Sequence, residues 1–182
     1  MSKPTSHPTS TPRIWFTGDT HFGHENIIHY TERPFANAKE MDAALIANWN
    51  AVVGTKDHVY HLGDVAHGPR SKDIIYLQRI IRKLNGVKHL VLGNHDHQRP
   101  AWYNEAGFDS VHYPYLTVEE FDLTHNPHEW DVGDSEAVFL CAHVHTSWKW
   151  RGQAINVGVD QWGYAPVSIE TIREEVAKYL KT

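Results

Sequence analysis

The sequence has few of the features that mark secreted, membrane-bound or nucleic-acid-coating proteins. Its 182 residues include one cysteine, Cys141, so a disulfide within the chain is excluded and a reducing, cytoplasmic location is expected. No apolar run reaches the roughly 18 residues that cross a membrane, and none follows the N-terminus as in a secretory signal. The net charge of −5 provides no overall positive field, so we expect neither a membrane partner nor a stable nucleic-acid complex.

Histidine is the residue type that is unusually frequent. The chain has 15 histidines, and they are scattered rather than consecutive, which excludes a purification tag as their source. Histidine is the commonest metal ligand and carries protons near neutral pH. The composition therefore indicates metal or proton chemistry.

The sequence predicts a short tail followed by one domain. Residues 1–12 are rich in Ser, Thr and Pro and should be disordered, whereas residues 13–182 fit a single domain. In the first half, runs predicted as strands alternate with runs predicted as helices, at 13–18, 37–53, 58–63, 71–86 and 87–93. Asn37 and Ser71 are the predicted helix caps, and Gly86 closes the second helix.

The second half consists mostly of short predicted strands. After a short helix from Pro100 to near Gly107, strands are predicted at 108–113, 115–119, 121–125, 137–141, 153–157 and 165–168. Ser168 then caps a last helix. Because the alternation in the first half favours βαβ units, we expect an α/β fold in which two mixed β-sheets pack face to face as a sandwich flanked by helices.

Five predicted strands end in side chains that can bind metal. These side chains are Asp19 and His21, Asp64, Asn94, His125, and His143 with His145. Ligands in open α/β sheets gather beyond the carboxyl ends of strands, so all five endings could meet. Each alone has an ordinary explanation, because Asp after Gly is common in turns and His-x-His can be a surface edge pattern. Their joint occurrence at five strand ends favours a shared site.

These side chains offer only oxygen and nitrogen donors, a set that suits Mn, Fe, Zn or Ni better than Ca or Mg. Seven ligands are too many for one transition-metal ion and fit two ions that share one carboxylate. Two divalent ions carry four positive charges, whereas Asp19, Asp64 and a bridging hydroxide carry one negative charge each. The remaining net charge of about +1 suits in-line attack on phosphorus.

The order of these motifs resembles that of the calcineurin-like metallophosphoesterases, especially their small prokaryotic and phage members, over residues 13–170. The matching motifs are Asp19-Thr-His21, Gly63-Asp64, Gly93-Asn94-His95-Asp96, His125 and His143-Val-His145, with DTHFGHENII near the start and INVGVDQWGYAPVS near the end. Ala142 stands where this family usually has Gly, a departure that would matter only if the backbone there required a positive φ.

The resemblance implies a four-layer α/β/β/α arrangement and a role for each site residue. One divalent ion would be held by Asp19, His21, Asp64 and His145, and the other by Asp64, Asn94, His125 and His143. Manganese is favoured, with Fe, Zn or Ni as alternatives. His95 is not a ligand by this resemblance but acts as general acid or stabilises charge on the phosphoryl group, and Asp96 orients His95.

Four polar side chains are candidates for contact with the substrate. His24, Arg33, His67 and Arg70 follow metal-bearing strand ends at short range, and each could bind phosphate oxygens through a charged hydrogen bond. Each is also explained as an ordinary solvated side chain.

Several other residues near the predicted site have weaker signals. The stretch SWKWRG at 147–152 alternates aromatic and basic residues, which could stack bases and hold phosphates. The same alternation also places Trp148 and Trp150 on one face of a half-buried strand, and this second interpretation is favoured. Trp162 and Tyr164 are candidates for a nucleobase platform. Asn156 and Asp160 are predicted to support the metal ligands.

The leading hypothesis is a dinuclear-metal-dependent phosphoesterase in which a metal-bridging hydroxide attacks a phosphodiester or phosphomonoester directly. No nucleophilic Ser or Cys is needed, and Cys141 in its apolar strand is predicted to be inert. The sequence has no insertion long enough to form a cap domain over the site, so we expect an open site. An open site favours a small phosphorylated substrate such as a nucleotide or cyclic nucleotide. The alternatives are a catalytically silent scaffold, which would show eroded motifs, and a nuclease, which would need a basic track.

Overall fold

The computed structural model describes residues 11–128 and 137–179. Residues 11 and 12 are exposed and carry no regular structure, and the rest of the predicted tail lies outside the described residues. The division into a tail and one domain stays a prediction. In the described ranges, no helix is long and apolar enough to cross a membrane.

The first sheet carries the strands predicted in the first half of the chain. Its order is β10-β1-β2-β3-β4, with β1 at Ile14–Thr17, β2 at His58–His61, β3 at Val87–Val91, β4 at Ser110–His112 and β10 at Val167–Ser168. Neighbours from β1 to β4 are parallel, and β10 is antiparallel to β1. The sheet is therefore mixed, and its first strand pairs with a segment near the end of the chain.

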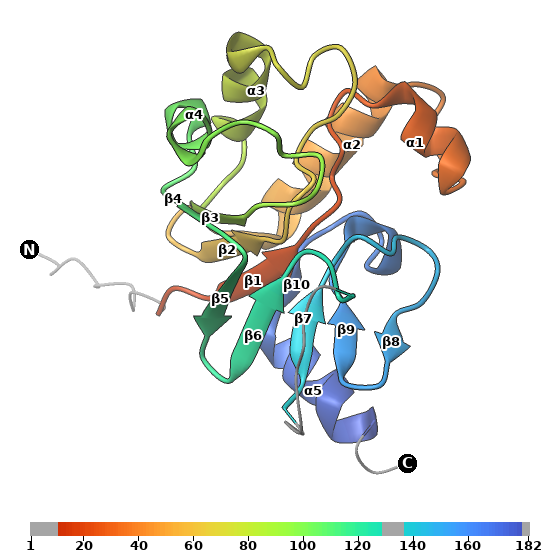
Figure 1. Ribbon diagram of the computed structural model, residues 1–182, viewed down its shortest axis with the longest axis vertical. Coiled ribbons are helices and arrows are strands. Elements are labelled where there is room, and N and C mark those ends of the chain that lie inside the picture. The colour runs from red at the N-terminus through yellow and green to blue at the C-terminus, as the bar shows by residue number, and fades with distance from the viewer. Residues whose placement is uncertain (1–10, 129–136, 180–182) are drawn as a thin grey trace, which may run out of the picture.

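Four helices cover one face of this sheet (Figure 1). They are α1 at Glu25–Tyr30, α2 at Ala38–Val52, α3 at Ile74–Ile81 and α4 at Pro100–Ala106. Asn37 caps α2 as predicted, because its side chain accepts a hydrogen bond from the Glu40 N–H. The predicted cap of α3 is wrong: the side chain of Asp73, not Ser71, accepts from the first backbone N–H groups of that helix.

The second sheet has the order β5-β6-β7-β9-β8. Its strands are β5 at Tyr115–Val118, β6 at Phe121–Thr124, β7 at Phe139–Cys141, β8 at Trp150–Arg151 and β9 at Ala154–Asn156. The pairs β6–β7 and β7–β9 are parallel, whereas the two edge strands are antiparallel to their neighbours. The strand predicted over 147–152 is thus reduced to the two residues of β8.

The two sheets face each other across an apolar layer. Because successive strand residues point to opposite faces, Trp15 packs under the helices while Phe16 joins Leu140 and Ile155 between the sheets. Helix α5 at Ile169–Tyr179, capped by Ser168, adds Ile172 to the same layer. The predicted α/β sandwich of two mixed sheets is confirmed.

Candidate metal centre

The turns after β1 and β2 continue the pairing of their strands, and this brings the first candidate ligands together. The N–H of Asp19 donates to Gly63 O at 3.0 Å, and the N–H of His21 donates to Asp64 O at 3.0 Å. An isolated parallel β-bridge also joins Phe22 to Ala66. The side chains that follow the two strands therefore lie at one edge of the sheet.

Glycines allow the turns after β2 and β3 to approach closely. A Cβ on Gly63, which has a φ of +84°, would lie 2.5 Å from the Gly93 nitrogen. In the space that remains, the backbone N–H of His95 donates to Asp64 Oδ1 at 2.8 Å. The Gly-Asp and Gly-Asn-His-Asp motifs thus depend on each other for their conformation.

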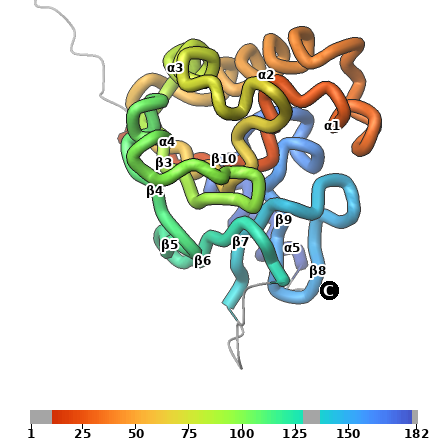
Figure 2. Tube along the Cα trace, turned by 45° about the horizontal axis from the view of Figure 1, so that its top comes forward, coloured from red at the N-terminus to blue at the C-terminus, as the bar shows by residue number. Residues whose placement is uncertain are grey.

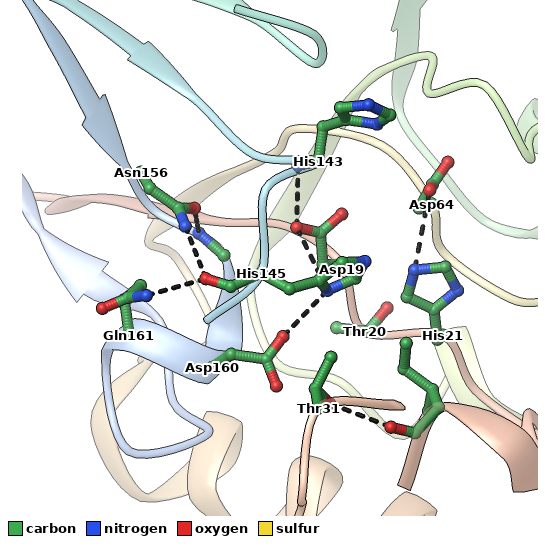
Figure 3. Close-up of polar contacts among 12 residues, drawn as sticks. Asp19, Thr20, His21, Thr31, Asp64, His143, His145, Asn156, Asp160 and Gln161 are labelled. Carbon is green, nitrogen blue, oxygen red and sulfur yellow. Dashed lines mark hydrogen bonds and ion pairs between the residues drawn. The ribbon is translucent and has the colours of Figure 1, made fainter. Parts of the chain in front are cut away.

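The second sheet joins this edge through hydrogen bonds that cross the sandwich. The backbone N–H of His143 donates to Asp19 Oδ2 at 2.8 Å (Figure 3). His125 Nδ1 lies 2.7 Å from Leu62 O, which leaves its Nε2 facing the centre. The ends of the two sheets therefore meet, and the loops that carry them converge in the second view of the chain (Figure 2).

All seven candidate ligands gather at this meeting point. Asp64 Oδ2 lies 3.5 Å from His21 Nε2 and 3.5 Å from His125 Nε2. Asn94 Oδ1 lies 2.9 Å from His125 Nε2 and 2.8 Å from His143 Nδ1. Two triads, Asp19–His21–His145 and Asp19–Asp64–His125, have donor atoms within 4.8 Å of one another and could each hold a metal ion.

Three buried donor atoms in this cluster make no hydrogen bond. They are Asp19 Oδ1 and both ring nitrogens of His21. A buried polar atom without a partner costs about 1–3 kcal/mol, so unpaired atoms in a native structure require an explanation. Bound cations would satisfy Asp19 Oδ1 and one ring nitrogen of His21, whose other nitrogen carries the proton of the neutral ring, and the donor set therefore fits divalent metal.

The backbone is strained at the same positions. Among the described residues, eight non-glycine residues have a positive φ, and five of them are candidate ligands: Asp19, His21, Asp64, His143 and His145. A non-glycine residue keeps this left-handed backbone conformation only where the surrounding contacts hold it in place, and such residues are common at functional sites. Ala142 is not among them, so the departure from the family's usual Gly leaves the local backbone unstrained.

Burial sets the protonation of the cluster in the metal-free protein. Burial raises the pKa of Asp19 to about 6, even though His145 and His125 lower it. Burial also holds the pKa of His21 well below its usual range, so its ring is neutral at pH 7. Neutral imidazole is the form that binds metal, and bound cations would favour the ionised carboxylate.

Residues at and just after the end of β9 contact His145. Its Nδ1 lies 3.0 Å from Asp160 Oδ2, and the side chains of Asn156 and Gln161 donate to its carbonyl at 2.8 and 2.7 Å (Figure 3). Asn156 and Asp160 thus contact a candidate ligand, which is the location predicted for supporting residues. Gln161 was not predicted, since an amide on a loop carries no signal in the sequence.

Arg33 also belongs to this support, and the prediction that it contacts substrate is wrong. Its side chain is completely buried. It donates to both carboxylate oxygens of Asp160 at 2.8 and 2.9 Å, and to the carbonyls of Asp19 and Thr20. Because these bonds occupy the guanidinium, Arg33 stabilises the turn after β1 instead of binding phosphate.

The role predicted for Asp96 is also corrected. Its Oδ2 accepts hydrogen bonds from the backbone N–H groups of Asp64 at 2.7 Å and Gly93 at 2.9 Å, and its Oδ1 accepts from Val65. The side chain folds back over its own turn and joins it to the turn after β2. The carboxylate nearest to the His95 ring is that of Asp64, at 4.0 Å from Nε2.

A cavity of about 610 Å³ opens beside the cluster. His21, His143 and His145 form part of its wall, and His24, His67 and His95 stand in a row, with ring centroids 4.4 Å and 4.2 Å apart. No lysine or arginine lines this cavity among the described residues. His24 and His67 thus have the location predicted for them.

Three other predicted contacts lie elsewhere. Arg70 stacks over the Tyr76 ring at 5.3 Å and lines a different cavity. The indole of Trp162 donates to Asn156 O, and the Tyr164 ring packs against Phe35. The predicted nucleobase platform is wrong, because Trp162 packs against the core between the sheets, Tyr164 packs against Phe35, and neither lines the cavity beside the cluster.

The family model that describes calcineurin-like phosphoesterases matches residues 12–174. This chain belongs to that family. A curated relative, "Uncharacterized protein MJ1445" of Methanocaldococcus jannaschii, is 35% identical over 93% of this chain and 94% of its own length. "Gene 66 protein" of Mycobacterium phage L5 is 29% identical over 82% of this chain and 87% of its own length.

A solved structure of similar shape supports the same placement. The crystal structure of the protein of unknown function AQ665 from Aquifex aeolicus has a TM-score of 0.69 and 26% identity, covering 90% of this chain and 99% of that one. Calcineurin-like phosphoesterases typically bind divalent metals, and the Asp/His clusters of this member could hold them. The predicted family and fold are confirmed.

Proposed function

We propose that this protein is a dinuclear-metal-dependent phosphoesterase that hydrolyses a small phosphodiester or phosphomonoester. One observation carries the proposal: at the point where five strand ends meet, both buried ring nitrogens of His21 and Asp19 Oδ1 lack any hydrogen-bond partner. An unpaired carboxylate oxygen and one unpaired imidazole nitrogen are suitable ligands for a divalent cation. The silent-scaffold alternative does not explain why a cavity opens directly beside them.

We assign one ion to Asp19, His21, Asp64 and His145 and the other to Asp64, Asn94, His125 and His143, with manganese favoured over Fe, Zn or Ni. The equal 3.5 Å separations of Asp64 Oδ2 from His21 and His125 support Asp64 as the shared ligand. The bonds from His145 Nδ1 to Asp160 and from His125 Nδ1 to Leu62 O leave the Nε2 atoms for metal. Metal-binding histidines usually have such a partner on the other nitrogen.

Two bound divalent ions would lower the pKa of a water molecule and neutralise the phosphoryl oxygens. His95 lines the cavity with its side chain 36% exposed, so its Nε2 can reach a leaving oxygen and give it a proton. His24 and His67, next to His95, are placed to donate hydrogen bonds to the non-bridging phosphoryl oxygens.

A nucleotide or cyclic nucleotide is the favoured substrate. Tyr30 stands at the cavity rim and is 72% exposed, with Asn26 and Ile27 beside it in the cavity wall. An exposed aromatic ring stacks on a base, and the neighbouring amide can form a hydrogen bond to it. The lack of lysine and arginine in the described wall favours a substrate with one phosphate over a long nucleic acid.

The test is hydrolysis by metal-reconstituted protein of a panel containing bis-p-nitrophenyl phosphate, p-nitrophenyl phosphate, cyclic nucleotides and short oligonucleotides. We expect His95→Ala to lower turnover by about 10²–10⁴-fold while the protein keeps its metal. His97→Ala is the matched control, because His97 is exposed and does not line the cavity. Absence of turnover with Mn, Fe, Zn and Ni would contradict the proposal, and turnover restricted to oligonucleotides would indicate a nuclease.

A further inference from the structure

A second cavity lies on the other side of the loop that carries His24. Its volume is about 860 Å³, within the usual range for small-molecule sites. Helices α2 and α3 provide most of its wall, and Gly23 and Glu25 form another part of it. His24, between these two residues, faces the metal centre instead. One short loop therefore separates two cavities.

The second cavity is basic in a protein that is acidic overall. Four cationic residues line it: Lys39, Arg70, Arg79 and Lys83. Glu25 and Asp42 are the acidic residues of the wall, so the formal charge of the lining is +4 − 2 = +2, against −5 for the chain.

Both acidic side chains are already engaged. Glu25 accepts a hydrogen bond from the Ala38 N–H at 2.9 Å. Asp42 accepts from the Gly23 N–H at 2.9 Å and from the Tyr76 hydroxyl at 2.5 Å. These carboxylates therefore hold the wall together, and among the described residues neither forms an ion pair with the cations of the lining.

The cations, in contrast, are left for a ligand. In the part of the chain that the structure describes, the side chains of Lys39, Arg79 and Lys83 form no hydrogen bond or ion pair. Arg70 lies 5.3 Å over the Tyr76 ring, which keeps its guanidinium plane at the wall. Several cations around one hollow suit an anion with more than one phosphate group.

The rest of the wall provides a surface for the uncharged part of such a ligand. Ala43, Ile46 and Ile80 line the cavity together with the Tyr76 ring. An apolar and aromatic wall beside several cations matches a nucleoside polyphosphate, whose base is flat and whose phosphates are charged. We propose that this cavity is a second binding site, distinct from the metal centre, for a nucleoside polyphosphate.

Binding is tested with metal-free protein in EDTA, so that phosphate cannot be held by ions at the centre. Isothermal titration calorimetry with ATP should show binding, and adenosine should bind at least about tenfold more weakly because the cations contribute nothing to it. The double variant Arg79→Glu/Lys83→Glu should weaken ATP binding by at least about tenfold. The matched control Lys72→Glu/Arg82→Glu reverses two exposed cations of the same region that do not line the cavity, and it should change binding less than about twofold.

Four outcomes would overturn the proposal. These are no ATP binding at millimolar concentration, equal binding of ATP and adenosine, equal effects of the two double variants, or tight binding of a single-stranded oligonucleotide with none of ATP. If circular dichroism shows that the double variant is unfolded, Lys83→Gln replaces it, with Lys72→Gln as its control. Because metal and turnover are absent from the assay, failure of the proposed phosphoesterase activity leaves this result unchanged.

Discussion

Arg33 and Asp160 form a doubly hydrogen-bonded ion pair whose two side chains are completely buried, although 127 positions separate them in the sequence. The same carboxylate bonds His145, and the same guanidinium bonds the carbonyl of Asp19. This pair therefore ties the turn after β1 to the loop behind His145, and both carry candidate ligands.

Loss of Arg33 should destabilise the fold strongly. Arg33→Ala leaves the buried Asp160 carboxylate uncompensated, and we expect the free energy of unfolding to fall by about 3–5 kcal/mol in urea titrations. Arg173→Ala is the control, because Arg173 makes an equivalent two-bond pair with Glu120 at the surface, where such pairs contribute about 0–1 kcal/mol. Equal losses for the two variants would contradict the role given to Arg33.

Asp160→Asn should weaken metal binding as well as folding, because this carboxylate supports His145 and also neutralises the buried Arg33 guanidinium. The amide keeps the shape of the side chain but no longer stabilises the His145 ring by charge, and we expect metal affinity to fall by about 10- to 100-fold. Competition with a fluorescent chelator measures this affinity. A variant that binds metal as tightly as the wild type would contradict the supporting role of Asp160.

Removal of metal should lower thermal stability. A ligand present at about 100 times its Kd stabilises the native state by about 2.7 kcal/mol, so EDTA should lower the Tm of metal-loaded protein by about 5–10 °C.

Asp64→Asn removes the proposed shared ligand and should reduce the bound metal, counted by mass spectrometry, from two ions to one or none. Asp122→Asn, in which the amide oxygen can still accept the exposed hydrogen bond from the Thr117 hydroxyl, should still bind two.

Tyr30 should affect substrate binding but not the chemical step. Because its ring is exposed at the cavity rim, Tyr30→Ala should raise KM for cyclic nucleotides about fivefold or more and leave kcat within about twofold. Tyr30→Phe keeps the stacking surface and should restore KM. A fall in kcat with unchanged KM would instead place Tyr30 in support of His24, whose ring lies 6.2 Å away.

Ionisation of Asp57 should make the free energy of unfolding depend on pH. Burial alone would raise the pKa of Asp57, but hydrogen bonds from the N–H groups of Arg13 and Gly54 and from the Trp15 indole outweigh it and lower the pKa. The resulting stabilisation is complete above the ordinary aspartate pKa of about 4 and is lost as pH falls through the lower folded-state value.

The variant Asp57→Asn measures this contribution. At about pH 7 we expect the wild type to be more stable than the variant by about 1–3 kcal/mol in urea titrations, because charged hydrogen bonds are lost. The difference should shrink toward about pH 3. A difference that stays constant over this range would show that ionisation of Asp57 does not contribute.

Local signals in the sequence predicted the elements that position the centre. Apolar runs that end in Gly-Asp or Gly-Asn located the ends of β1, β2 and β3, and Pro100 with Gly107 located α4. Helix α1 was missed, because it has six residues and its N-cap, His24, makes no capping hydrogen bond. A helix this short has too few turns for its periodicity to show.

The errors at the site have a common cause. Whether Arg33 meets a substrate or a carboxylate depends on Asp160, which lies far away in the sequence and is placed only by the folded second sheet. Asp96 was assigned to its neighbour His95, but its partners are backbone N–H groups of two different turns. Identity and spacing of ligands are visible in a sequence, whereas the direction of a side chain at a turn is not.

The pairing of β1 with β10 has a consequence for the order in which the protein can assemble during synthesis. Trp15 emerges from the ribosome early, but its neighbour Ser168 emerges when almost all of the described chain has been made. The partners of Asp19 and Arg33 in the later loops are delayed in the same way. During synthesis β1 to β4 and the last candidate ligand, His145, are made before β10, so the donors can gather before the edge beside β1 is closed by Val167 and Ser168.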